Sequence, residues 1–520
     1  MRSHLVACLA AASAVLAACS GDEESGPPPR CPGVMDDGDD DPTAAGPFDA
    51  PDDFDRGGCG DDGALEDVDV CGIWNLDMAV ETYRFPGSIR VDADADGADL
   101  EGFLYGGGAF DVRHTSGDLF LRTVDEYPDG EGGMIALTRT IDACDVSEEG
   151  VLSGRYASCW GDECNEGTFS ATKVEPLEEP PASGLTLLGE WNGPPDAPWP
   201  GPDEALTLNV RHLGDIAYVT RHDGLHIVDV ADPAHPSELG ALAVGFPDDG
   251  EYYNDVKMTE AGDRIYALMG SNLRGVVVID VTDPAAPAEV TAFPPVIDGA
   301  VNVHTLFVEG TRIYFANYGV EVWDIADPTL PQRLGGYVHP GESVNGVHDL
   351  YVEDSVAYLD NWDLGMVVVD LTDPAAPALV GVFDDYDRRT SHSSWNTEAG
   401  GRRIAVHGDE DFGAHVRVID LDGLEEIGAY QTRPSVSVHN ILADGETAYV
   451  TYYQDGLRVL DLSDPTRPTA VAHYQTWPGP ESGYGQSFYE GAIGVDLDTQ
   501  KGLIYLADTH RGLLILQLDR

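Results

Sequence analysis

Four histidines and two acidic residues occupy matching places in separate segments of the chain. Three of the histidines stand nine residues before an Ala-Tyr or Ile-Tyr pair, the fourth has the same place after a three-residue insertion, and the acids stand near it. The set is His304, His348, His392, His439, Asp255 and Glu490. Imidazole nitrogens and carboxylate oxygens bind zinc, copper and iron, so these residues would form a metal site if they converged in space. The alternative is that each histidine makes a hydrogen bond within its own segment and binds no metal.

These segments belong to a repeat that runs from residue 185 to residue 520. Its most regular part is a five-residue apolar run that closes on an aspartate, such as VVVID at 276–280 and MVVVD at 366–370. The runs end at Asp229, Asp280, Asp324, Asp370, Asp420 and Asp461, and a degenerate copy ends at Gln517. Successive ends are 41 to 56 residues apart. A period in the forties that is built from short strands predicts the blades of a β-propeller.

Most of the runs lead into a D-x-x-D-P-x-x-P motif, as at 280–287. Aspartate accepts hydrogen bonds from nearby backbone amides and proline cannot continue a ladder, so the motif predicts a turn. With these motifs, residues 185–520 resemble the LVIVD-repeat proteins, a family of bacterial surface β-propellers. The resemblance implies a fold and no particular reaction.

The two ends of the repeat region complement each other. Residues 186–191 (TLLGEW) match the fourth strand of a unit, and the last unit, 488–517, ends after its third strand. We expect these strands to pair, which closes a ring of seven blades and removes exposed sheet edges. The histidines and acids described above would then begin the innermost strands and meet at the mouth of the axial channel.

One face of such a ring carries the loops from fourth to first strands and from second to third strands. The first kind are long and variable here, and loops of this type on a rigid scaffold usually carry binding residues. Their aromatic residues are Trp199, Tyr252, Tyr253, Tyr386, Trp395, Trp477, Tyr484 and Tyr489. Together with many acids they suit a protein, peptide or glycan partner, although a solvated acidic rim would explain the acids alone.

The composition limits the range of partners. There are 28 Lys+Arg against 93 Asp+Glu, which gives a formal net charge of −65. Nucleic acids and anionic lipids are bound through basic surfaces, so we expect no nucleic-acid partner. The 60 Gly and 34 Pro argue against long helices and favour an all-β chain.

Residues 1–18 predict a lipoprotein signal peptide. Arg2 and His4 precede an apolar run, 5–18, that is too short to span a bilayer as a stable helix. The sequence LAAC at 16–19 resembles the lipobox of bacterial lipoproteins, which implies an acylated Cys19 as the mature N-terminus, and Ser20 implies sorting to the outer membrane. An ordinary signal peptide cut before Cys19 is the alternative. The lipid would be the only membrane anchor.

Three regions separate this anchor from the propeller. Residues 19–70 are rich in Gly, Pro and acids, which predicts a disordered acidic tether. Residues 71–175 have short apolar segments between turns, which predicts a small antiparallel β-barrel-like domain, and residues 176–184 a linker. Six cysteines from Cys31 to Cys164 predict disulfides in an exported chain. We expect Cys159 to pair with Cys164, and Cys31 with Cys59 is a candidate for a loop within the tether.

The expected fold class is therefore all-β, with a seven-bladed propeller after a barrel-like domain and a disordered tether. The expected function is non-catalytic binding of a partner or ligand through the loop-rich face, by an exported lipoprotein of the cell envelope. The alternative is a metal-dependent hydrolase or oxidase that uses the His/Asp/Glu set at the channel mouth. No G-x-S-x-G, P-loop or dinucleotide-binding motif accompanies the fold. A divalent or transition metal ion is the one cofactor that the residues suggest.

Overall fold

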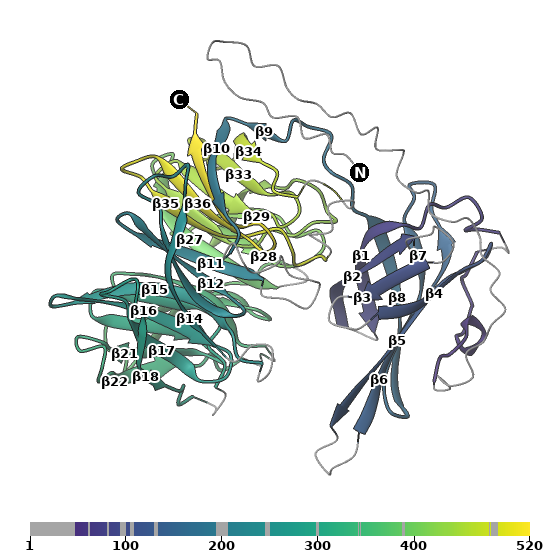
Figure 1. The fold of residues 1–520 in the computed structure, drawn as a ribbon, viewed down its shortest axis with the longest axis horizontal. Helices are drawn as coiled ribbons and strands as arrows, with labels where there is room; N and C mark the ends of the chain where they lie inside the picture. Colours follow the sequence, from purple (N-terminus) through teal and green to yellow (C-terminus); the bar gives the residue numbers. More distant parts are fainter. Residues whose placement is uncertain are drawn as a thin grey trace, which may run out of the picture.

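The computed structural model contains two β-structures joined by a short linker: a barrel and a propeller (Figure 1). It describes residues 47–519 except 61–62, 81–82, 94–99, 105–108, 129–133, 194–205, 245–249, 298–300, 342, 344, 387–389, 478 and 480–486. The signal-peptide residues and Cys19, Ser20, Cys31, Trp199 and Tyr484 lie outside the described residues. The described part contains one short 3-10 helix, η1 (Pro51–Asp53), and it has no helix of the length and apolarity that crossing a membrane requires.

Eight antiparallel strands form the barrel, and pairing of the first with the last closes it. They are β1 (Gly72–Val80), β2 (Tyr83–Ala93), β3 (Leu100–Leu104), β4 (Ala109–His114), β5 (Leu119–Pro128), β6 (Met134–Val146), β7 (Leu152–Trp160) and β8 (Glu163–Lys173). Alternate side chains of a strand point to the same side, so Trp74, Leu76 and Met78 all enter the barrel core. The barrel confirms the predicted small antiparallel domain.

Residues 47–60 and 63–70 pack on this barrel. Phe54 is 6% exposed, and Leu65 and Val70 have no exposed surface. The indole Nε1 of Trp74 donates a hydrogen bond to the carbonyl of Val70 at 2.8 Å. The predicted boundary of the disordered tether at residue 70 is therefore wrong for these residues, because apolar side chains scattered among the acids are buried on the barrel.

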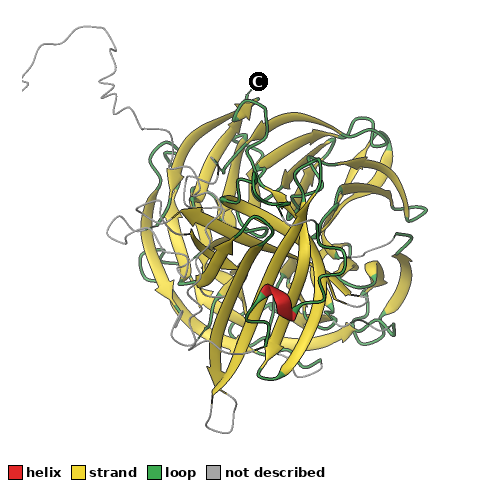
Figure 2. Cartoon of the chain, turned by 90° about the vertical axis from the view of Figure 1, so that its right-hand side faces the viewer, coloured by secondary structure: helices red, strands yellow, loops and turns green. Residues whose placement is uncertain are grey.

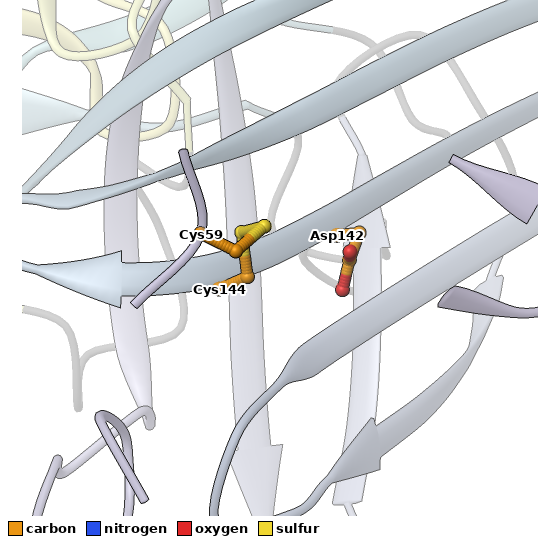
Figure 3. Close-up of side chains that lie close together, drawn as sticks. All are labelled: Cys59, Asp142 and Cys144. Carbon is orange, nitrogen blue, oxygen red and sulfur yellow. A yellow bond between two sulfur atoms is a disulfide. The ribbon is translucent and has the colours of Figure 1, made fainter. Parts of the chain in front are cut away.

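Disulfides tie the barrel region together. Cys159 pairs with Cys164 across the β7–β8 hairpin, as predicted. Cys59 pairs with Cys144 of β6 (Figure 3), so the suggested pairing of Cys59 with Cys31 is wrong. The Cys59–Cys144 bond spans 85 residues and fastens the segment before the barrel to a barrel strand. Such a long closed loop restricts the unfolded chain and stabilises the folded one.

The propeller has seven sheets, which are its blades. Blade 1 contains β11 (Thr207–Leu213), β12 (Ile216–Arg221), β13 (Gly224–Asp229) and β14 (Ser237–Ala243). Blade 2 contains β15 (Tyr253–Ala261), β16 (Arg264–Ser271), β17 (Gly275–Asp280) and β18 (Ala288–Phe293). Blade 3 contains β19 (Leu306–Glu309), β20 (Arg312–Ala316), β21 (Val320–Asp324) and β22 (Gln332–Tyr337). Blade 4 contains β23 (Val347–Glu353), β24 (Val356–Asn361), β25 (Gly365–Asp370) and β26 (Ala378–Phe383).

Two of the remaining three blades take a strand that precedes blade 1 in the sequence. Blade 5 contains β27 (Ser391–Ala399), β28 (Arg402–Asp409), β29 (Val416–Asp420) and β30 (Glu425–Tyr430). Blade 6 contains β31 (Ile441–Asp444), β32 (Thr447–Thr451), β33 (Leu457–Asp461) and β34 (Thr469–Tyr474), with β9 (Ala182–Ser183) added at its edge. Blade 7 contains β35 (Ala492–Asp498), β36 (Leu503–Asp508), β37 (Gly512–Leu518) and β10 (Leu185–Trp191).

Pairing of β10 with β37 closes the ring. Leu185 faces Leu518 and Trp191 faces Leu513, so the strand that precedes blade 1 supplies the fourth strand of the last blade. The innermost strand of blade 7 also contacts that of blade 1. The seven-bladed, closed propeller predicted from the repeat is thus confirmed.

The repeat motifs have the local roles that their chemistry predicts. In the first turn, the amide of Ala231 donates to Asp229 Oδ1 at 2.9 Å and the amide of Ala234 to Asp232 Oδ1 at 3.1 Å. The apolar runs before these turns are buried between blades, as in Val276–Ile279 of β17. Turn and run together fix the register of each blade, and the register places each innermost strand.

The barrel lies beside the propeller (Figures 1 and 2), and it contacts the loops between blades 5 and 6 and between blades 6 and 7. The buried amide of Asn75, in β1, donates to the carbonyl of Ser435 at 2.8 Å, in the loop between blades 5 and 6. Trp477, in the loop between blades 6 and 7, is 2% exposed and packs with Ile73 and Val174 of the barrel side. The barrel therefore covers part of the face on which the sequence predicts binding.

Candidate functional site

The four histidines lie side by side at the axis of the propeller. They come from consecutive blades, at or just before the innermost strands β19, β23, β27 and β31. Neighbouring ring centroids are 4.1 Å apart for His304 and His348, 4.2 Å for His348 and His392, and 4.3 Å for His392 and His439. All four line one axial cavity of about 100 Å³. Ring closure brings these residues together although they are far apart in the sequence.

Their hydrogen bonding is unusual for buried polar rings. His392 is 2% exposed, and neither of its ring nitrogens makes a hydrogen bond of ordinary geometry. The Nδ1 atom of His348 has no partner either. His439 makes a hydrogen bond of ordinary geometry, from Nδ1 to the carbonyl of Ile493 in the next blade at 2.7 Å. His348 and His392 make looser contacts of the same kind with the backbone of His392 and of His439, also in the next blade. The histidines therefore do not each make a hydrogen bond within their own blade.

A carboxylate outside the predicted set completes this cluster. Glu410, directly after β28, is 6% exposed and accepts a hydrogen bond from the hydroxyl of Tyr453. Its Oε2 lies 3.7 Å from His392 Nε2, and its Oε1 lies 4.0 Å from His439 Nε2. One ligand atom each from His348, His392 and Glu410 lie within 4.8 Å of one another, so the three can converge on one ion. We call these three residues the axial triad.

Burial keeps the imidazoles of the cluster neutral. Burial, with a contribution from the neighbouring imidazoles, lowers the pKa of His392 and of His348 well below the usual range. Burial lowers the pKa of His439 to about 3, although its bond to the Ile493 carbonyl opposes the shift. Burial also raises the pKa of Glu410 to about 7, against the effect of the Tyr453 hydroxyl. Metal-binding histidine must be neutral, and these histidines already have that form at neutral pH.

The two predicted acids do not join the histidines as ligands. Asp255 lines the axial cavity, but its carboxylate accepts hydrogen bonds from Asn209 at 2.8 Å and from Lys257 at 2.5 Å. Glu490 is not among the described residues that line the cavity, and its Oε2 lies 3.4 Å from Nε2 of His510. Counting along the repeat located the correct strand ends, but it could not show which neighbours compete for each carboxylate.

Another buried histidine, with partners of its own, lies in blade 5, the blade that contains His392 and Glu410. His407, on β28, has no exposed surface, and its Nδ1 lies 3.1 Å from Asp360 Oδ1 and 3.0 Å from the Ser394 hydroxyl. Its Nε2 lies 3.7 Å from Asp409, whose carboxylate also accepts from Arg417 at 2.7 Å. Burial alone would lower the pKa of His407, but the two carboxylates outweigh it and raise the pKa to about 9. This imidazole is therefore protonated and held within a charge network.

Cysteine ligation of a metal has no basis in the described residues. Cys59, Cys144 and Asp142 lie close together in the barrel (Figure 3). All five described cysteines are disulfide-bonded, however, and only a thiolate sulfur is a good metal ligand. Asp142 is instead a buried carboxyl, whose pKa burial raises to about 7, and Arg56 approaches it at 3.8 Å.

A larger cavity opens on the loop-rich face beside the histidines. Its volume is about 420 Å³, within the usual range for small-molecule sites. Besides His304 and His348, its polar and aromatic lining is Asn302, Asn317, Tyr318, Asn345 and Trp362. The rings of Trp362 and His348 are 5.0 Å apart, and His348 is the member of the axial triad that lines this cavity. We call it the face cavity.

The predicted aromatic residues do not form one exposed binding surface. Tyr253 is 1% exposed, Trp477 is under the barrel, and Tyr252, Tyr386, Trp395 and Tyr489 are half-buried. Trp395 lines the axial cavity, and the hydroxyl of Tyr386 donates to Asp409 at 3.1 Å. These rings serve mainly to hold strands and loops in place, because large aromatic groups gain most from burial.

The residues absent from the predicted set share a position. Glu410 and Trp362 each follow the second strand of a blade directly, in the short loop that leads to the third strand. The aromatic residues of the predicted binding face belong instead to the longer loops between blades. The sequence does contain a signal for these two residues. The loops from second to third strands carry polar or aromatic side chains, and they open on the same face.

Comparison with known proteins identifies the repeat. A family model described as LVIVD repeat matches residues 207–244, 266–293, 346–385 and 437–476, which lie in blades 1, 2, 4 and 6. The comparison with curated proteins found no match.

Several solved structures are similar to the chain. The structure of U3-55K is 10% identical, with 64% of this chain and 98% of that chain covered and a TM-score of 0.47. Raptor of Chaetomium thermophilum is 11% identical, with 64% and 28% covered and a TM-score of 0.47. The WD40 repeats of RRP9 are 10% identical, with 62% and 99% covered and a TM-score of 0.45. From its own strands and repeats, this chain is a seven-bladed β-propeller protein that carries LVIVD repeats.

Proposed function

We propose that this chain is an exported lipoprotein, anchored to the outer membrane through Cys19, whose propeller binds a neutral glycan in the face cavity. The disulfide-bonded state of the described cysteines, as in Cys59–Cys144 and Cys159–Cys164, supports an oxidising compartment. The propeller of LVIVD repeats supports a role as a binding scaffold. The lipobox-like end of the signal peptide supports the anchor.

The lining of the face cavity carries the proposal for a glycan. The described residues around it include no Asp, Glu, Lys or Arg, which is exceptional in a chain with 93 acidic residues. Asn302 and Asn345 offer amide donors and acceptors, and Tyr318 and Trp362 offer ring surfaces. Sugars present hydroxyl groups at their edges and C–H groups on their faces, so amides and aromatic rings suit them. Among the described lining residues, a charged peptide would find no partner for its charges.

The cavity is also built in advance. The side-chain amide of Asn317 donates to the backbone carbonyl of Asn302 at 2.6 Å, and the hydroxyl of Tyr318 donates to the backbone carbonyl of Ser343 at 2.9 Å. The side-chain amide of Asn345 donates to Asp363 Oδ1 at 3.1 Å. Because these contacts already hold the walls, a ligand would order few side chains on binding, which favours affinity.

Binding of purified full chain to an array of neutral glycans tests the site. We expect binding that falls about tenfold or more in Trp362→Ala, since loss of one stacking ring is worth about 1.4 kcal/mol or more. Trp160→Ala is the matched control, because Trp160 is a 46% exposed ring on the barrel and its removal leaves the face cavity unchanged. Binding that is equal in the two variants, or confined to charged peptides, would overturn the proposed ligand.

Fatty-acid labelling tests the anchor separately. In a bacterial host we expect the chain to incorporate labelled palmitate and to enter the detergent phase on Triton X-114 separation. The variant Cys19→Ala should do neither, since no other anchor is proposed. A labelled Cys19→Ala chain, or an unlabelled parent chain, contradicts the lipoprotein assignment without affecting the glycan proposal.

A further inference from the structure

We propose that the axial triad of His348, His392 and Glu410 binds one divalent transition-metal ion, with Nε2 of His439 as a fourth ligand. The triad donors lie within 4.8 Å of one another. The Nε2 atom of His439 is 4.0 Å from the Glu410 carboxylate. This inference goes beyond the proposed function and does not depend on the identity of any ligand in the face cavity.

The absence of hydrogen bonds at His392 is the main reason to assign a ligand here. Buried polar atoms in proteins nearly always have a hydrogen-bond partner, and an unpaired one calls for an explanation. His392 is 2% exposed, and neither of its ring nitrogens has a hydrogen-bond partner of ordinary geometry; the backbone of His439 offers this imidazole only a looser contact. Its Nε2 points toward Glu410 Oε2 at 3.7 Å, too far for a hydrogen bond but suited to a shared ion. A metal would satisfy imidazole and carboxylate together.

His439 has the orientation that metal-binding histidines commonly have. Its Nδ1 faces the carbonyl of Ile493 at 2.7 Å. Because a carbonyl can only accept, Nδ1 carries the proton and Nε2 keeps a lone pair. A second hydrogen bond of this kind fixes the tautomer and ring direction of metal-ligating histidine. The lone pair of Nε2 is on the side of Glu410.

The donor types select the class of metal. Two or three neutral imidazoles with one carboxylate suit Zn²⁺, Fe²⁺ or Cu²⁺, whereas Ca²⁺ and Mg²⁺ prefer oxygen ligands. The ligands stand at the ends of strands in three blades, which hold their separations more firmly than a mobile loop would. The face cavity borders His348 and gives the ion a route to the surface.

Metal titration of the full chain after chelator treatment tests the inference. We expect one equivalent of Zn²⁺ to bind in isothermal calorimetry and to raise the melting temperature. Affinity should fall at least about tenfold in His392→Ala and in Glu410→Gln, since each removes a direct ligand. His235→Ala is the matched control: His235 is an exposed histidine 3.0 Å from Asp232, so it tests surface His–carboxylate pairs.

A measurement on the parent chain avoids reliance on variants that fail to fold. With one equivalent of Cu²⁺, electron spin-echo spectroscopy should detect at least two coordinated imidazoles. Copper held by oxygen ligands alone would overturn the inference. So would a parent chain that binds no Zn²⁺, or one that binds it no more tightly than His392→Ala and Glu410→Gln.

Discussion

Two buried histidines of blade 5 differ in protonation although both are inaccessible to solvent. His407 lies between the carboxylates of Asp360 and Asp409, and they raise its pKa to about 9 against the effect of burial. His392 has one carboxylate nearby, that of Glu410 at 3.7 Å, whose own pKa burial raises to about 7, and burial lowers the pKa of His392 well below the usual range. Burial alone therefore does not decide the charge of an imidazole; the presence of carboxylate partners does.

The difference separates a structural cluster from a candidate ligand site. The two clusters meet at adjacent residues of the sequence: Asp409 belongs to the cluster of His407, and Glu410 belongs to that of His392. Asp409 is paired with Arg417 at 2.7 Å and faces His407, whereas Glu410 faces His392 at 3.7 Å without a cationic partner. Protonation of His407 completes a charge network, and the neutral form of His392 leaves lone pairs for a metal ion. The predictions below test this contrast at neighbouring residues.

Removing the charge of Asp409 should have the largest effect. Asp409→Asn leaves buried Arg417 and His407 without their shared carboxylate, and loss of one partner from a buried ion pair costs about 3–5 kcal/mol. Chemical denaturation should detect this loss in the free energy of unfolding. The exposed Asp422 of the same blade is the matched control, and Asp422→Asn should change stability by no more than about 0.5 kcal/mol. Similar losses in both variants would mean that the network does not stabilise the blade.

The charge of His407 should also make stability depend on pH. Its pKa is raised from 6.5 to about 9, so the folded chain binds its proton more tightly than the unfolded chain does. The resulting stabilisation is complete below pH 6.5 and is lost as pH rises toward 9. A shift of this size corresponds to on the order of 3 kcal/mol.

Denaturation curves of the parent chain and of His407→Gln across this range isolate the effect. The facing groups Asp360, Asp409, Tyr386 and Ser394 are common to both chains. The parent chain should lose stability relative to the variant as pH rises. A difference that does not vary with pH would show that His407 is neutral in the folded chain.

The same change from carboxylate to amide at Glu410 should have the opposite sign. Burial raises the pKa of Glu410 to about 7, so ionisation of this group destabilises the metal-free fold at higher pH. Glu410→Gln removes the charge and keeps an acceptor for the Tyr453 hydroxyl. In chelator-treated protein near pH 8 we expect unfolding to require about 1–3 kcal/mol more. Destabilisation as large as that of Asp409→Asn would place Glu410 in a structural network instead.

The sequence predicts the blades and the ring because their determinants are local. The aspartates and prolines of each turn and the apolar run before it repeat along the chain, and the closing strand 186–191 has the same pattern without partners. Ring closure then follows from the count of units, and it predicts that His348 and His392 meet.

The remainder of the site depends on contacts that no repeat encodes. The competition of Lys257 for Asp255 is a contact between side chains of one blade, and the approach of Glu410 to His392 depends on the path of a short loop. Docking of the barrel is likewise non-local: it buries Trp477, which the sequence places on an open binding surface. The pairing of Cys59 with Cys144 links segments whose spatial proximity requires the closed barrel.

The smallest expected effect is that of salt on the stability that the Asp409 network contributes. The chain carries a formal net charge of −65, so screening of its exposed acids should raise the melting temperature of the parent chain. Raising NaCl from about 0.1 M to about 1 M shortens the Debye length from about 10 Å to about 3 Å, but buried pairs are screened much less than exposed ones. The stability difference between Asp409→Asn and the parent chain should therefore change by less than about 0.5 kcal/mol. If salt abolishes most of that difference, the Asp409 network is open to solvent, and the contrast with His392 cannot rest on buried carboxylate partners.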